Sequence, residues 1–112
     1  MKKQRIYISG PISYRDPKAT VERFEKIESL LKTKGFEVFN PKKNGLPPES
    51  TAHQHMHRDL AELTNEDNPY DIIYMMRGWL HSKGCKLEFD AATAIGMSVM
   101  FQETGLETFK FE

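Results

Sequence analysis

The amino-acid sequence predicts an α/β protein in which a parallel sheet of about five strands is covered by helices on both faces. Short apolar runs alternate along the chain with longer segments of helical periodicity. In addition, the run at residues 71–76 is apolar on both of its alternating faces, as in a strand from the middle of a covered sheet. The 112 residues fit one domain, residues 1–112, because a second core normally requires a chain of more than about 200 residues.

The chain is predicted to begin with a strand followed by a helix. Residues 5–9 suit a short strand, and Gly10 followed by proline ends it, since proline lacks an N–H donor. Asp16 followed by proline is a typical helix start, and apolar residues then recur at helical spacing as far as Leu31. Gly35 is placed to end this first helix.

A second strand and a second helix are predicted next. Residues 36–39 are aromatic and β-branched, and Asn40 followed by proline ends that strand. After a polar loop over residues 42–49, a helix is expected to begin near Ser50, with an apolar stripe at Met56, Leu60 and Leu63. It is expected to end within residues 65–69.

The second half of the chain repeats this alternation. Residues 71–76 form the predicted central strand, residues 78–84 a loop, and residues 85–95 a third helix that Gly96 caps. We expect the core face of this helix to consist of Leu87, Ala91, Ala94 and Ile95.

Two further strands complete the predicted sheet. Residues 98–101 form the fourth, and the alternating residues 108–111 form a fifth at the edge. The pattern is typical of a three-layer, doubly wound fold with the flavodoxin-like strand order 2-1-3-4-5. Ligands bind to such sheets beyond the carboxyl ends of the strands, at the switch point between strands 1 and 3.

The composition excludes several classes of partner. Lys and Arg (16) balance Asp and Glu (16), so no overall field attracts a nucleic-acid polymer. No apolar run approaches the roughly 20 residues that span a membrane. Because Cys85 is the lone cysteine and no apolar signal region precedes the first strand, we expect a cytoplasmic protein. A small phosphorylated ligand is compatible with this charge balance.

Three turns are expected to meet at the switch point. They follow strands 1, 2 and 3 and supply the predicted ligand-binding residues Ser9, Gly10, Pro11, Ile12, Ser13, Asn40 and Trp79. Ser82 and Gly84 stand where the third helix begins, and free N–H groups at a helix start favour an anion such as phosphate. The alternative for Ser82 is a purely structural N-cap.

Two carboxylates are expected near the same crevice. Glu88 lies about one turn into the third helix, at the border of its apolar stripe, where a carboxylate can serve as nucleophile or base. Asp59 lies beside the stripe of the second helix, and two carboxylates around one bond suit glycosidic cleavage. The alternatives are that Glu88 only complements the helix dipole and that Asp59 pairs with His55.

Three histidines, His53, His55 and His57, alternate in the second helix. His53 and His57 share one helix face, as pairs of metal ligands do. The chain has no His-Glu-x-x-His pattern and its one cysteine is remote, so a fourth ligand is missing. We therefore predict no metal site and no cofactor, and we expect these histidines to be solvated or to face a sugar.

Six short motifs follow one another over nearly the whole chain. They are Tyr-Ile-Ser-Gly-Pro (7–11), Phe-Asn-Pro (39–41), Arg-Asp-Leu-Ala-Glu-Leu (58–63), Asp-Ile-Ile-Tyr (71–74), Gly-Trp (78–79) and Ser-Lys-Gly-Cys-Lys-Leu-Glu (82–88). In this order they resemble the nucleoside 2-deoxyribosyltransferase-like superfamily, and within it a group of small bacterial and phage domains of unknown function, DUF4406. Each motif is weak alone, and the order makes the resemblance specific.

The resemblance implies a site and a reaction. In the related 2′-deoxynucleoside 5′-monophosphate N-glycosidase, a Ser-x-Gly-x-x-x-Glu segment binds the 5′-phosphate and supplies the nucleophile, and Ser82, Gly84 and Glu88 occupy those positions. The roles of orienting the nucleophile, forming the phosphate loop and assisting catalysis then belong to Tyr7, to Gly10 and Ile12, and to Asp59. The implied reaction is retaining: Glu88 attacks C1′ of a 2-deoxyribose, the base leaves, and water or another base resolves the glycosyl-enzyme.

One position departs from the related enzyme. That hydrolase has an arginine after its phosphate loop, where this chain has Ser13. Arg15 is near this position but displaced, and Arg77 or Lys83 could supply the cation for a phosphate instead, the alternative being that both are solvated. The loops at residues 42–51 and 76–82 are expected to select the base. The competing interpretation is a catalytically silent nucleotide or nucleotide-sugar binding module, because a fold does not fix a function.

The expected partner is a small molecule, a deoxynucleotide or deoxynucleoside. Members of the family that the chain resembles are oligomers with shared pockets, which implies a homodimer or a larger homo-oligomer. The helical periodicity places Phe89 on the side away from the core, and we expect Phe89 and the third helix to form the interface. The alternative is that Phe89 packs on a neighbouring loop.

Overall fold

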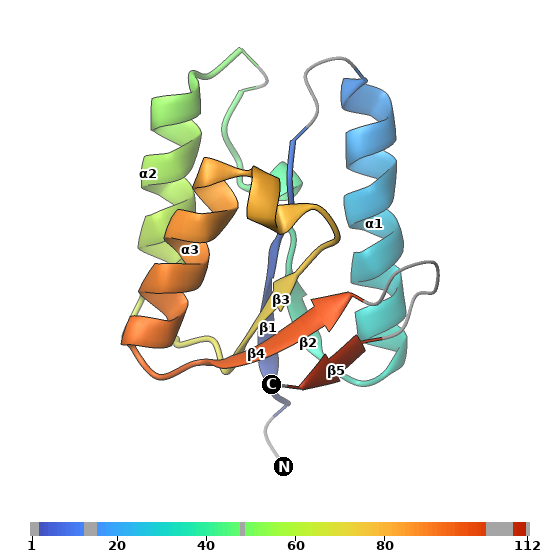
Figure 1. Ribbon diagram of the computed structural model, residues 1–112, viewed down its shortest axis with the longest axis vertical. Helices are drawn as coiled ribbons and strands as arrows, with labels where there is room; N and C mark the ends of the chain where they lie inside the picture. Colours follow the sequence, from blue (N-terminus) through green and yellow to red (C-terminus); the bar gives the residue numbers. More distant parts are fainter. Residues whose placement is uncertain (1–2, 13–15, 48, 103–108, 112) are drawn as a thin grey trace.

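Four parallel strands form the centre of the molecule, in the order β2-β1-β3-β4. They are β1 (Arg5–Ser9), β2 (Glu37–Phe39), β3 (Ile72–Met75) and β4 (Ser98–Gln102). The computed structural model describes residues 3–12, 16–47 and 49–102, and the backbone of residues 109–111 (Figure 1). The predicted α/β architecture and the predicted order of these four strands are confirmed.

The prediction of a fifth parallel strand is wrong. The segment β5 (Phe109–Phe111) pairs antiparallel with β4, so the parallel part of the sheet ends at β4. Only residues 103–108 separate the two segments in the chain. A parallel connection needs a crossover of a dozen or more residues, so a link of this length permits only an antiparallel return.

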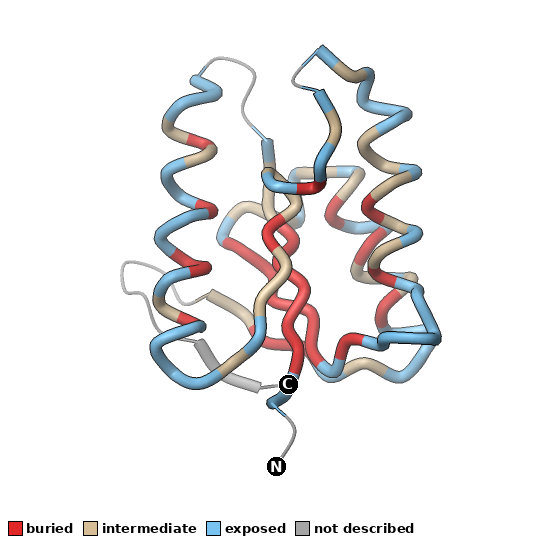
Figure 2. Tube along the Cα trace, turned by 180° about the vertical axis from the view of Figure 1, so that it is seen from behind, coloured by how far each residue is buried: buried red, intermediate tan, exposed pale blue. Residues whose placement is uncertain are grey.

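Helices cover both faces of the sheet (Figure 1). On one face, α1 (Pro17–Thr33) packs on alternate strand residues, in a core that contains Ile6, Ile8, Phe24, Ile27, Leu31, Ile72 and Tyr74. On the other face, α2 (Ala52–Leu63) and α3 (Lys83–Ala94) pack on the intervening residues, in a core that contains Tyr7, Leu63, Ile73, Met75, Cys85 and Ala92. Strands β1 and β3 are buried along their whole length (Figure 2).

Local sequence signals determine where the helices begin and end. The side chains of Asp16, Thr51 and Ser82 each accept a backbone N–H of the helix that they precede. Gly35 and Gly96 follow the ends of α1 and α3 with φ of 95° and 87°, a conformation that favours glycine. In the chain as described, no helix combines the length and the apolar content that crossing a membrane requires.

The buried face of α3 differs from the predicted one. Leu87 and Ile95 are 47% and 56% exposed, and Ala94 is exposed too. The helix instead buries Cys85, Glu88 and Ala92. The apolar pattern predicted the wrong face because it assigns every carboxylate to solvent, whereas a buried carboxylate is tolerated where hydroxyl groups hydrogen-bond to it.

Phe89 also faces inward, which corrects its predicted outward position. Its ring stacks on Trp79 of the short helix η2 (Trp79–His81), with 4.8 Å between the ring centroids. Both rings pack against the core of the α2/α3 face. The alternative prediction, that Phe89 packs on a neighbouring loop, is the one that the structure confirms.

Candidate functional site

A cavity of about 800 Å³ lies at the carboxyl ends of the parallel strands, where the sequence predicts ligand binding. Its wall is formed by residues that follow β1 and β2, by α1, by one side of α2 and by the beginning of α3. The predicted site residues that line it are Gly10, Ile12, Asp59, Ser82, Gly84 and Glu88. Folding therefore brings together residues that are far apart in the sequence.

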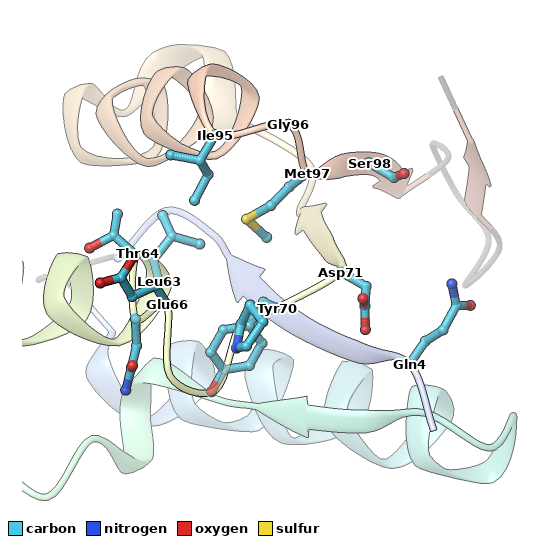
Figure 3. A pocket seen from close by; sticks show the side chains of 12 residues that line it. Gln4, Leu63, Thr64, Glu66, Tyr70, Asp71, Ile95, Gly96, Met97 and Ser98 are labelled. Atoms are coloured by element: carbon cyan, nitrogen blue, oxygen red, sulfur yellow. The ribbon is translucent and has the colours of Figure 1, made fainter. Parts of the chain in front are cut away.

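A second cavity, of about 620 Å³, lies at the opposite end of the sheet, between the ends of α2 and α3 and the residues before β3 and β4 (Figure 3). None of the predicted site residues that the structure describes lines this cavity. Its carboxylates, Glu66 and Asp71, are exposed, and Asp71 accepts the backbone N–H of Arg5. The candidate functional site is therefore the first cavity.

Two hydroxyl groups hold the carboxylate of Glu88. The hydroxyl of Tyr7 donates a hydrogen bond to Oε2, and the hydroxyl of Ser9 donates one to Oε1 at 2.7 Å. Tyr7 and Ser9 are alternate residues of β1, so both point from one face of the sheet toward α3. All three side chains are buried, and of the three only Glu88 lines the cavity.

Burial raises the pKa of Glu88 to about 7. Loss of solvation is the main cause and the charge of Asp59 adds to it, whereas the hydrogen bonds from Tyr7 and Ser9 lower the pKa. Burial and the neighbouring Glu88 raise the pKa of Tyr7 well above its usual value, so its hydroxyl stays a donor. A carboxyl group with a pKa near 7 exchanges its proton at neutral pH, as acid–base chemistry requires.

Asp59 is the second carboxylate of the cavity. It is buried, and burial raises its pKa although the hydrogen bond from Asn44 and the nearby His55 lower it. The Nδ2 atom of Asn44 lies 2.9 Å from Oδ1 of Asp59 and 3.1 Å from Nδ1 of His55. Asn44 thus contacts both Asp59 and His55, whereas the alternative prediction was a direct pair of these two residues on the helix surface.

The cavity wall also carries basic side chains, namely Lys42, His53, His55 and His57. Of the predicted cations for a phosphate, Arg77 and Lys83 do not line the cavity, and Arg15 lies outside the described residues. Lys42, which belongs to a loop expected to select the base, lines the cavity instead of these residues. Within the described ranges, no three His, Cys, Asp or Glu side chains are arranged to hold a metal ion.

The other predicted binding residues contact the protein itself. Asn40 caps the short helix η1 (Pro41–Lys43) and donates a hydrogen bond to Glu28 at 3.2 Å. Trp79 stacks on Phe89, and Pro11 lies beside Gly78. The structure does not place Asn40, Trp79 or Pro11 on the cavity wall, and Ser13 lies outside the described residues.

Asn44 was not among the predicted site residues. The sequence signal at this point is the dipeptide Asn-Gly, which indicates a turn, and Gly45 does adopt a φ of 88°. Nothing in the local sequence indicates that the Asn44 side chain contacts a helix residue 15 positions later. That contact depends on how the loop after β2 packs on α2.

Comparison with known proteins identifies the family of this chain. No curated protein matches the chain. The model of the family described as a domain of unknown function, DUF4406, matches residues 4–101. The match includes Tyr7, Ser9, Asn44, Asp59 and Glu88, and it covers most of the 112 residues. The chain therefore belongs to the DUF4406 family.

Proposed function

We propose that this protein is a cytoplasmic enzyme that cleaves or transfers the N-glycosidic bond of a 2′-deoxynucleoside 5′-monophosphate or deoxynucleoside, with Glu88 as nucleophile. One observation carries the proposal: a buried carboxylate, oriented by Tyr7 and Ser9, lines a cavity that a second carboxylate also lines. The motifs that resemble the nucleoside 2-deoxyribosyltransferase-like superfamily support the same assignment.

The reaction assigns different roles to the two carboxyl groups. Glu88 attacks C1′ as a carboxylate, the C1′–N bond breaks, and the departing base takes a proton from Asp59. The oxygen of water, or a nitrogen of a second base, then attacks C1′ of the glycosyl-enzyme. The bond between C1′ and Glu88 breaks and frees the carboxylate, and the attacking group passes its proton to Asp59. Burial raises the pKa of both carboxyl groups, and the charge of Asp59 adds to the shift at Glu88, so protons are held at this site up to higher pH than by exposed carboxyl groups.

The beginning of α3 suits the 5′-phosphate. Ser82 and Gly84 line the cavity where the free N–H groups and the positive end of the helix dipole favour an anion. Lys42 adds a cation elsewhere on the wall, where its charge lowers the pKa of Asp59. A volume of about 800 Å³ falls within the range of sites that enclose ligands of nucleotide size.

The test is chromatographic detection of free base after incubation with a panel of deoxynucleoside monophosphates. We expect base release by the wild type and a loss of at least ~1,000-fold in Glu88→Gln, which keeps the shape and removes the nucleophile. Glu62→Gln is the matched control, because Glu62 also accepts a tyrosine hydroxyl, at 2.6 Å from Tyr70, but does not line the cavity. Full activity in Glu88→Gln would refute the mechanism.

A non-catalytic nucleotide or nucleotide-sugar binding module is the second candidate function. It is favoured by the fact that both oxygens of Glu88 already accept hydrogen bonds from within the protein. This candidate predicts nucleotide binding by wild type and Glu88→Gln, measured by titration calorimetry, with no base released even when a second base is supplied as acceptor.

A further inference from the structure

Asn44 lies behind the cavity wall and connects two residues that line it. Its side chain is buried and does not line the cavity, whereas both Asp59 and His55 do. Its Nδ2 contacts Oδ1 of Asp59 at 2.9 Å and Nδ1 of His55 at 3.1 Å. Its Oδ1 accepts the backbone N–H of Leu46 at 3.1 Å. One buried carboxamide thus has three partners.

These partners determine which way the carboxamide of Asn44 points. The backbone N–H of Leu46 can only donate, so the Asn44 atom that faces it must be the oxygen. With the oxygen on that side, the nitrogen of Asn44 faces Oδ1 of Asp59, which accepts its N–H. The two N–H groups of Nδ2 are therefore directed to Asp59 and to His55.

The second of these N–H groups selects a tautomer of His55. A donor that points at Nδ1 requires that nitrogen to accept, and a neutral imidazole with an accepting Nδ1 carries its proton on Nε2. The opposite tautomer would set N–H against N–H at 3.1 Å and leave a buried donor of Asn44 without an acceptor. The remaining nitrogen of His55 is therefore a hydrogen-bond donor.

The position of His55 shows which part of a ligand this donor would meet. His55 precedes Asp59 by one turn of α2, and both residues line the same cavity. With the deoxyribose at Glu88 and Asp59 and the 5′-phosphate at the beginning of α3, as proposed above, we place the base against the stretch of wall at His55.

We propose that Asn44 fixes His55 as the Nε2–H tautomer and that this N–H donates a hydrogen bond to an acceptor atom of the substrate's base. A carbonyl oxygen or an unprotonated ring nitrogen provides such an acceptor. Asn44 is then a positioning residue for both Asp59 and His55. The identity of the ligand rests on the proposed function, whereas the tautomer rests only on hydrogen bonds within the free protein.

The tautomer is tested on the free, full-length protein by long-range ¹⁵N–¹H NMR of its histidine rings. The His55 signals, assigned by their loss in His55→Gln, are expected to show the Nε2–H pattern in the wild type. Asn44→Asp replaces the donor by an acceptor, and we expect it to place a proton on Nδ1. A wild-type His55 that is mainly Nδ1–H overturns the proposal, even if Asn44→Asp does not fold.

The ligand is tested by titration calorimetry with free nucleobases and, separately, with 2-deoxyribose 5-phosphate. His55→Leu is expected to weaken binding of the base by about 3- to 10-fold and to leave binding of the sugar phosphate unchanged, whereas His55→Gln, which keeps an N–H donor, recovers part of the loss. Weakened sugar-phosphate binding with unchanged base binding, or no base binding by the wild type, overturns the assignment. Because none of these readouts requires turnover, failure of the glycosidase proposal is recognised separately.

Discussion

A buried carboxyl group makes the stability of a protein depend on pH, and Glu88 is such a group. Its pKa is about 7 in the folded chain, compared with 4.5 for an ordinary glutamate. Because the folded state has the higher pKa, it binds the proton more tightly. The resulting stabilisation is fully present below pH 4.5 and is lost as the pH rises through about 7.

We therefore expect the free energy of unfolding of the wild type to fall by about 3 kcal/mol between acid and alkaline pH, relative to Glu88→Gln, which cannot ionise. Urea denaturation of both proteins at pH 4.5 and at about pH 8 measures this difference. Glu28, whose pKa is lowered to about 2, is present in both proteins, so its contribution cancels in the comparison. Parallel pH profiles for the two proteins would contradict a buried, ionisable Glu88.

Gly10 is the second residue whose local environment gives a clear prediction. A Cβ atom at this position would lie 2.4 Å from Sδ of Met76 and 3.0 Å from Cζ of Phe24. Gly10→Ala is therefore expected to lower the free energy of unfolding by about 1–3 kcal/mol, measured by urea denaturation. In Gly84→Ala the new Cβ is close, at 3.0 Å, only to the end of the flexible Met56 side chain, so that variant is the milder control.

At the scale of elements, the beginning of α3 combines a structural and a functional role in Ser82. The Ser82 hydroxyl accepts the N–H of Cys85 at 3.2 Å as an N-cap, and Ser82 lines the cavity where we place the phosphate. A substitution of Ser82 can separate these two roles. A carboxylate at this position still caps the helix, so stability is kept, but it repels an anion bound at the helix start.

We expect Ser82→Ala to lower the free energy of unfolding by about 1 kcal/mol, through loss of the cap. Ser82→Asp keeps the cap and the stability, but it should weaken binding of 2-deoxyribose 5-phosphate by at least ~10-fold, because two negative charges then face each other. Thermal unfolding and titration calorimetry measure the two effects. Unchanged sugar-phosphate affinity in Ser82→Asp would exclude the beginning of α3 as the phosphate site.

The sequence predicted where helices begin and end better than it predicted which face of a helix is buried. Asp16, Gly35, Ser82 and Gly96 mark helix ends by local hydrogen bonding or backbone conformation, so these ends were predictable. The buried face of α3 was not, because the pattern of apolar residues cannot show that hydroxyl groups of β1 hydrogen-bond to Glu88. For the same reason, Leu87 was expected in the core and is 47% exposed.

At the scale of the whole molecule, we predict a homodimer or a larger homo-oligomer. Phe89 no longer supports this expectation, because it stacks on Trp79 within the chain. Leu80 and Leu87, which are 59% and 47% exposed, are the large apolar side chains available on η2 and α3. Light scattering is expected to give at least twice the chain mass of 13.0 kDa, and a monomeric mass would refute the prediction.

The sequence by itself determined the alternation of strands and helices, the order of the four parallel strands and the end of the sheet at which a site should lie. The alternation follows from hydrophobic periodicity and from short-range capping and turn signals, and the strand order and the position of the site follow from the topology of doubly wound sheets. The tertiary structure decided which side chains meet. Tyr7 and Ser9 contact Glu88 across 81 and 79 residues of chain, and Asn44 joins His55 to Asp59. Hydrogen bonds between distant residues depend on how helices and loops pack on the sheet, and no local pattern encodes that packing.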